Sequence, residues 1–155
     1  TLAVSTAGRL YAFGSGSMGQ LGHGDRANQH APRVVAALQD VRVSAVAAGH
    51  DHSLAPSGGK VSSFGSLKCD KLGNGNNGGN TDFQCTPLVI AGLPGVRVFS
   101  VAAGGRSSLA VTTDGEAYGW GRGGGNNRMP HPVLGLELTE DQLVPLKYQG
   151  LRLHA

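Results

Sequence analysis

The sequence predicts an all-β fold made of β-propeller blades, each with four antiparallel strands. Two observations carry this prediction: a repeat of roughly 50 residues, and four short apolar runs separated by glycine-rich turns within each copy. Four strands in a repeat of that size are typical of a propeller blade. The composition agrees, because Gly is 26 of 155 residues and charged residues are only 15%, too few for long solvated helices.

The repeat is plain in two long segments. Asp40 to Gly65 reads DVRVSAVAAGHDHSLAPSGGKVSSFG, and Gly95 to Gly121 reads GVRVFSVAAGGRSSLAVTTDGEAYGWG. The segment from Thr1 to Gly14, TLAVSTAGRLYAFG, matches the later part of both. We therefore predict one domain over residues 1–155, with copies at approximately residues 1–52, 53–107 and 108–155.

Each copy is predicted to hold its strands at corresponding places. In the second copy, apolar runs bounded by turn residues predict strands at residues 42–47, 53–55, 60–64 and 87–91. Three such copies give about twelve strands. The tight turns between the second and third strands carry Gly8, Gly59 and Gly115, where the turn needs a positive φ. The structural repeat positions that we expect are Gly14, Gly49, His52, Gly65, Gly104, Trp120 and Gly121.

The stretch from Gly14 to Gly19, GSGSMG, matches the G-x-G-x-x-G pattern of nucleotide-binding loops. That pattern requires a strand before it and a helix that opens at its last glycine. A short strand at 9–13 is plausible, but Gln20 to Asp25 brings two further glycines, and glycine disfavours a helix interior. We therefore interpret these glycines as turns and predict no cofactor.

Three motifs at fixed mutual spacing resemble the regulator of chromosome condensation repeat. Ala47 to Ala55 reads AAGHDHSLA, Asp114 to Gly121 reads DGEAYGWG, and Gly19 to Asp25 reads GQLGHGD. The resemblance covers essentially the whole chain, and propellers of this family usually have seven blades. We therefore expect about three blades of a seven-bladed propeller. Open blade flanks favour aggregation, so we expect a larger propeller or an assembly to cover them.

The copies depart from the family pattern in two places. In the second copy Gly-Gln-Leu-Gly becomes DKLG at 70–73, followed by a loop rich in Asn and Gly. In the third copy Ser107 stands at the histidine position, and the tract from Arg122 to Leu143 replaces the motif. This tract is either a projecting loop with contacts of its own or a tolerated surface insertion.

The resemblance implies a protein-interaction scaffold that is part of a larger protein or assembly. The alternative is a guanine-nucleotide exchange domain for a Ran-like small GTPase. In the founding member of the family, turns of the A-G-x-x-H type line one face of the propeller and touch Ran. The matching turns nominate His50, Asp51 and Arg106 as partner contacts, and Arg122 and Arg128 in the divergent tract join them.

The polar cluster at 50–53 allows a catalytic alternative. Asp51, His52 and Ser53 have the residue types of a hydrolase triad, but neighbours in an extended segment point in different directions. The sequence also lacks G-x-S-x-G and H-E-x-x-H motifs. We therefore favour a binding module over an enzyme, and we expect His52 to hydrogen-bond turn backbone between blades.

Cys69 and Cys85 are either a disulfide or two free thiols, and we favour free thiols because no secretory signal pattern is present. Two cysteines lack the paired spacing of a zinc site, and the Asn/Gly loop at 74–82 has a single carboxylate, so we predict no metal.

Several partner classes are disfavoured. The basic residues behind the net charge of +3 are scattered, and RGGGNN at 122–127 holds one arginine, so we expect no nucleic-acid ligand. No apolar run is long enough for a membrane helix, and we expect no membrane insertion. The partners that we expect are proteins, a small GTPase or a multi-subunit assembly. The expected location is intracellular: cytoplasm, nucleus or cilium.

Overall fold

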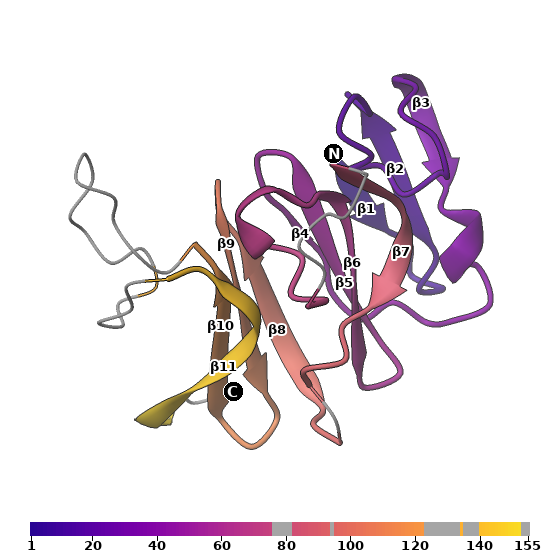
Figure 1. Ribbon diagram of the computed structural model, residues 1–155. Coiled ribbons are helices and arrows are strands. Elements are labelled where there is room, and N and C mark those ends of the chain that lie inside the picture. Colours follow the sequence, from indigo (N-terminus) through magenta and orange to yellow (C-terminus); the bar gives the residue numbers. More distant parts are fainter. Residues whose placement is uncertain (76–81, 94, 123–133, 135–139, 153–155) are drawn as a thin grey trace.

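The computed structural model describes residues 1–75, 82–93, 95–122, 134 and 140–152. They form three antiparallel sheets, which stand next to one another as successive blades (Figure 1). The predicted all-β fold of partial propeller type is therefore confirmed. Among the described residues, no helix is both long and apolar enough to cross a membrane.

The strands of each blade follow one another in space as they do in the chain. The first blade holds β1 (Leu2–Val4), β2 (Leu10–Gly14) and β3 (Gln29–Val34). The second holds β4 (Ala47–Ala48), β5 (His52–Ser57), β6 (Lys60–Ser66) and β7 (Phe83–Val89). The third holds β8 (Val98–Ala103), β9 (Ser107–Thr112), β10 (Glu116–Gly121) and β11 (Gln142–Arg152). Two short 3-10 helices, η1 (Ala36–Leu38) and η2 (Lys68–Asp70), lie in the connections.

The first strand of the second blade is shorter than predicted, and the described residues hold eleven strands rather than twelve. The run at 42–47 was expected to be a strand, but β4 keeps only two residues, and Val43 adds an isolated bridge to Ser57. Pro56 of β5 faces this segment, because its carbonyl accepts a hydrogen bond from the Ser44 amide at 2.9 Å. Proline has no N–H, so it cannot donate the second hydrogen bond that would extend the pairing of β4 with β5. In the third blade Val111 stands at the corresponding position, and β8 has six residues.

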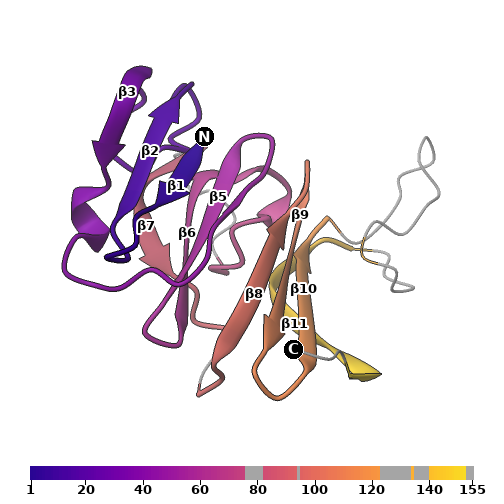
Figure 2. The ribbon, with the colours of Figure 1, turned by 180° about the vertical axis from the view of Figure 1, so that it is seen from behind.

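Two apolar cores fill the spaces between the blades. Ala55 and Phe64 of the second blade pack with Leu10 and Ala12 of the first. Leu54 and Val61, from the other face of the second blade, pack with Trp120 of the third. In both views β8 of the third blade runs beside β5 of the second (Figures 1 and 2). Burial of an aromatic side chain contributes roughly 1.5–3 kcal/mol relative to exposure, so each seam is a main source of stability.

Glycines of the connecting loops pack directly against the two large buried aromatic side chains, Phe64 and Trp120. A Cβ on Gly22 would lie 2.9 Å from the Phe64 ring, and one on Gly73 would lie 2.6 Å from Trp120 Nε1. Both glycines have a positive φ, +72° and +67°. The loop from Gly16 to Gly22 is a series of turns in which no helix begins, as predicted. Its glycines therefore serve packing between blades.

Candidate functional site

A hollow of about 520 Å³ lies over the seam between the second and third blades. Three connections border it: the turn between β4 and β5, the η2 segment after β6, and the turn between β8 and β9. Its lining residues are His50, Asp51, Lys68, Cys69, Lys71, Gly105 and Arg106. The structure therefore brings together His50, Asp51 and Arg106, the three turn residues that the sequence nominated as partner contacts.

The two turns have the same backbone design. The Gly49 amide donates to the His52 carbonyl at 2.9 Å, and the Gly104 amide donates to the Ser107 carbonyl at the same distance. The His50 amide reaches across the seam to the Gly104 carbonyl, at 3.3 Å. A Cβ on Gly49 would lie 2.5 Å from that carbonyl oxygen, so glycine is required for the two turns to approach this closely.

Glycine also lets the third strand of each blade pass beneath the neighbouring turn. Gly65 has a φ of +121°, and a Cβ there would lie 2.5 Å from the Asp51 carbonyl oxygen. Gly121 has a φ of +98°, and a Cβ there would lie 2.6 Å from the Arg106 carbonyl oxygen. Gly14 shares this conformation, with a φ of +103°. Gly65 and Gly121 therefore allow the third strands of their blades to lie in close contact with the turns that border the hollow.

A buried hydrogen-bonded chain joins the blades beneath the hollow. His52 Nε2 lies 2.8 Å from Ser108 Oγ, and Ser108 Oγ donates to the Lys71 carbonyl at 2.7 Å. Trp120 Nε1 donates to the same carbonyl at 2.9 Å. The prediction that His52 hydrogen-bonds turn backbone is wrong: His52 does join two blades, but its partner is the side-chain hydroxyl of Ser108. The serine was overlooked because its role depends on a neighbour 56 positions away.

The direction of these bonds fixes the tautomer of His52. The only proton of the Ser108 hydroxyl goes to the Lys71 carbonyl, so the serine oxygen accepts from a protonated Nε2 of His52. The other ring nitrogen, Nδ1, is buried and has no hydrogen-bond partner among the described residues, so a second proton there is disfavoured and the imidazole is neutral. Burial, reinforced by the nearby charge of Lys71 and opposed by Asp51, lowers the pKa of His52 from 6.5 to about 4.

Lys71 and Asp51 form an ion pair at the floor of the hollow, with Lys71 Nζ 2.5 Å from Asp51 Oδ1. The side chain of Lys71 is 3% exposed, and that of Asp51 is 18% exposed. A buried ammonium is strongly destabilising without a partner, so Asp51 is held in place by this bond and not free to swing outward. The lysine is a departure from the family motif in the sequence, and its pairing with Asp51 was not predicted.

The η2 segment contributes two further residues that sequence analysis missed, Lys68 and Cys69. Cys69 and Asp70 have positive φ values of 62° and 54°, the only non-glycine residues with this conformation in the described part of the chain. Gly19 occupies the position of Asp70 in the first copy, with a φ of +76°. Burial, and then the charge of Asp141, raise the pKa of Asp70. The loop thus has the shape of a glycine turn without its glycine.

The remaining nominated residues are placed as follows. The Arg122 amide donates to the Arg106 carbonyl at 2.9 Å, so Arg122 lies beside the hollow without lining it. Arg128 and most of the divergent tract lie outside the described residues. Cys69 and Cys85 are free thiols.

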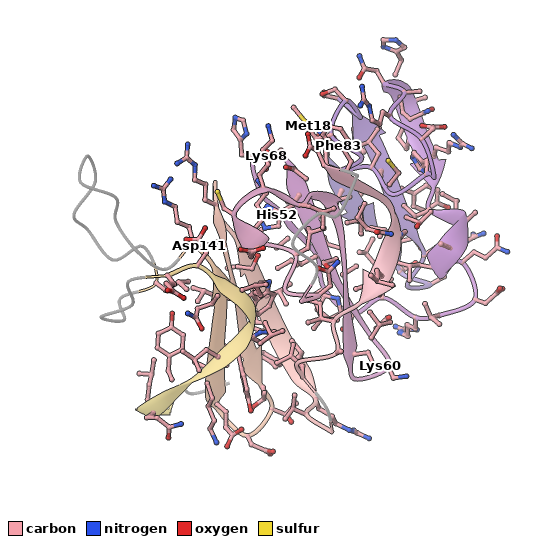
Figure 3. The ribbon with its side chains drawn as sticks, in the orientation of Figure 1. Met18, His52, Lys60, Lys68, Phe83 and Asp141 are labelled. Atoms are coloured by element: carbon pink, nitrogen blue, oxygen red, sulfur yellow. The ribbon has the colours of Figure 1, made fainter. Side chains whose placement is uncertain are left out.

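The polar cluster at 50–53 is divided among three partners. Asp51 pairs with Lys71, His52 bonds Ser108, and Ser53 Oγ donates to the Gln20 carbonyl at 2.8 Å. No proton relay therefore connects Asp51, His52 and Ser53. The hollow presents charged side chains to a ligand. One of them, Lys68, lies at the end of the blades where the turns are, whereas Lys60 lies at the opposite end (Figure 3). The arrangement is suited to binding.

Comparison with known proteins decides the family of the repeat. The regulator of chromosome condensation (RCC1) repeat matches residues 7–55, and a second description of that repeat matches residues 100–127. The chain is built from RCC1-type repeats. The first match includes the turn with His50 and Asp51, and the second match includes the turn with Arg106.

Relatives with RCC1-like sequence are found in proteins of very different description. The chain is 37% identical over 99% of its length to the ultraviolet-B receptor UVR8 of Arabidopsis thaliana, and covers 34% of that protein. It is 38% identical over 98% of its length to the human E3 ubiquitin-protein ligase HERC2, and covers 3% of it. The structure of Prp20p from Saccharomyces cerevisiae superposes with a TM-score of 0.74 at 27% identity, over 94% of this chain and 35% of that one. The chain thus spans about a third or less of these proteins.

Proposed function

We propose that this RCC1-like chain is a protein-interaction module whose partner docks on the hollow between the second and third blades. One observation carries the proposal: two turns that lie a full repeat apart in the sequence place His50, Asp51 and Arg106 around one hollow. These turns are pinned by glycines, a backbone bond and a buried hydrogen-bonded chain. A rigid, charged surface of this kind binds with little ordering cost.

The range of relatives supports an interaction role over one particular chemistry. RCC1-like sequence occurs in a photoreceptor and in a ubiquitin ligase, and the Prp20p structure was described together with binding to Gsp1p and histones. A repeat that serves such different proteins is best understood as a binding scaffold. The division of Asp51, His52 and Ser53 among three structural partners supports the same role.

The second candidate is guanine-nucleotide exchange on a Ran-like GTPase. The likeness to Prp20p, with its described binding to Gsp1p, favours this candidate. His50 is the residue with which to test it, because its side chain is exposed and the Asp51 carboxylate is committed to Lys71. Exchange predicts that His50→Ala slows the release of GDP from the GTPase. Equal release with and without the chain would exclude exchange and leave the scaffold proposal standing.

The interaction proposal is tested by placing a photo-crosslinking amino acid at His50 and, as a control, at Lys60. Both side chains are exposed, but Lys60 begins β6 at the end of the blade away from the hollow (Figure 3). The proposal expects discrete protein adducts, identified by mass spectrometry, from position 50 and none of the same identity from position 60. Identical adducts from both positions, or none from position 50, would contradict it.

A further inference from the structure

We infer that the hollow between the second and third blades selects an acidic segment of the partner protein, with Lys68 and Arg106 as the selecting contacts. This inference rests on the proposed function, since it names the chemistry of the partner at the same site. The chain offers three independent lines of support: the charges that line the hollow, their distribution over the repeats, and the geometry of the two cations.

The charged groups that line the hollow are three cations, Lys68, Lys71 and Arg106, and one carboxylate, that of Asp51. The carboxylate is paired through Oδ1 with Lys71, whose side chain is buried. Lys68 and Arg106 are exposed, and neither forms an ion pair with another described residue. Two of the cations that line the hollow are therefore exposed and without an ion-pair partner among the described residues.

The repeat shows that the fold does not require these cations. At the preceding seam, the positions of Lys68, Lys71 and Arg106 are held by Ser17, Gln20 and Asp51. The structural bond is the same in both seams: Ser53 Oγ donates to the Gln20 carbonyl at 2.8 Å, as Ser108 Oγ donates to the Lys71 carbonyl at 2.7 Å.

The formal charge at these three positions therefore has opposite signs at the two seams. The three positions carry a formal charge of −1 at the first seam and +3 at the second. The ion pair with Asp51 accounts for Lys71. Both seams fold with the same serine-to-carbonyl bond, so packing accounts for neither Lys68 nor Arg106. A requirement for binding an anion explains these two exposed cations directly.

The geometry favours carboxylates on a peptide. The planar guanidinium of Arg106 can hold a carboxylate by two parallel hydrogen bonds, while Lys68 supplies a point charge from the η2 segment. A hollow of about 520 Å³ accommodates one or two side chains of the partner. Neighbouring Asp or Glu residues of a partner segment would then reach both cations together.

The experiment uses fluorescence anisotropy with the full chain and a blocked, labelled octaglutamate peptide. Lys68→Ser with Arg106→Asp restores the residues of the preceding seam. Lys60→Ser with Arg97→Asp is the matched control, since it changes the net charge equally using exposed cations at the other end of the blades. Circular dichroism and thermal unfolding verify that each variant is folded. If the double variant fails to fold, the single variants Lys68→Ser and Arg106→Ser are measured instead.

We expect the native chain to bind the peptide, with affinity that falls as salt rises, and the hollow variant to bind at least tenfold more weakly. The control variant should stay within about threefold, since exposed charges far from the peptide are screened. Absence of peptide binding, or equal loss in both variants, would overturn the inference. Displacement of the peptide by inorganic phosphate at equal concentration, or preferential binding of a single-stranded oligonucleotide, would also overturn it.

The inference and the proposed function fail in different ways. If the adducts from position 50 persist unchanged in the Lys68→Ser, Arg106→Asp background, the chain binds its partner there without charge selection. The interaction proposal then stands and the acidic partner is excluded. If position 50 yields no adducts while octaglutamate still binds, the hollow has the inferred chemistry but the proposed docking role fails.

Discussion

His52 on the second blade and Ser108 on the third lie 2.8 Å apart, Nε2 to Oγ, and both side chains are buried. The Ser108 hydroxyl donates a hydrogen bond to the carbonyl of Lys71, which also accepts one from Trp120. Two blades and the loop between them are therefore joined through one hydroxyl group. Removal of the Ser108 hydroxyl oxygen alone should therefore weaken the contact between the second and third blades.

Ser108→Ala is predicted to lower the free energy of unfolding by about 1–3 kcal/mol, because it leaves the Nε2 proton of His52 buried without an acceptor. Urea unfolding measures the change. Ser107→Ala is the matched control, since Ser107 is the adjacent, half-buried residue of the same strand. Similar losses in the two variants would show that the His52 bond is not the cause.

The neutral state of His52 predicts a dependence of stability on pH. Since the folded-state pKa of about 4 lies below the ordinary 6.5, the unfolded chain binds a proton more readily between these values. Stability from this group is therefore fully present above pH 6.5 and falls as the pH falls toward 4, by on the order of 3 kcal/mol in total.

Urea unfolding at pH 7, 5.5 and 4.5 tests this dependence. His52→Asn should flatten the loss of stability below pH 6.5, whatever its effect at pH 7. His30→Asn is the control, because His30 is exposed. A pH profile that His52→Asn leaves unchanged would assign the acid sensitivity to another group.

The turn at Asp70 predicts a stabilising substitution. Asp70 has a φ of 54°, where Gly19 stands in the first copy, and burial together with Asp141 raises the pKa of its carboxyl. Asp70→Gly should raise the free energy of unfolding by about 1 kcal/mol, since it removes the cost of the left-handed backbone and a carboxylate in an unfavourable place.

Asp40→Gly serves as the control for that substitution. Asp40 is exposed and has no positive φ, so glycine there should lower stability by a few tenths of a kcal/mol to about 1 kcal/mol. Thermal unfolding of both variants gives the comparison. A loss of stability in Asp70→Gly would mean that the aspartate makes a favourable contact that outweighs its conformation.

Much of the fold could be predicted from the sequence because its signals are local. The turn glycines, such as Gly59 with a φ of +79°, are dictated by hairpin geometry that the flanking residues reveal. The shortening of β4 was not predicted, because it depends on Pro56 from the neighbouring strand. Strand pairing places this proline opposite the segment, and no periodicity within 42–47 records it.

The candidate site was predicted only in part, for the same reason. His50, Asp51 and Arg106 lie on turns that the repeat aligns, so their common face follows from the sequence. Lys71 contacts two distant segments: its carbonyl accepts from Ser108 of the third blade, 37 positions away, and its ammonium pairs with Asp51 on the turn between β4 and β5 of its own blade. A comparison of DKLG with GQLG could have indicated the added charge, but its partner Asp51 lies on another connection of the same blade, and only the folded blade brings the two side chains together.

The last prediction compares the same residue position on two blades. Leu54 and Leu109 occupy corresponding places in β5 and β9, yet Leu54 is fully buried against the third blade and Leu109 is 41% exposed on its outer face. The row across this face continues through Gly119 to Leu146, which is 38% exposed. The third blade thus presents the kind of apolar surface that the second blade buries.

Leu54→Ala should lower the free energy of unfolding by about 2–5 kcal/mol, because it opens a cavity in the seam, whereas Leu109→Ala should cost less than about 1 kcal/mol. Leu109→Ser should also reduce self-association of the chain, measured by sedimentation velocity at several concentrations, since an exposed apolar row favours contact between copies. Equal destabilisation by the two alanine variants would mean that Leu109 is covered in solution. Because the substitutions are identical and the positions correspond, the difference in stability isolates the contribution of the blade that covers Leu54.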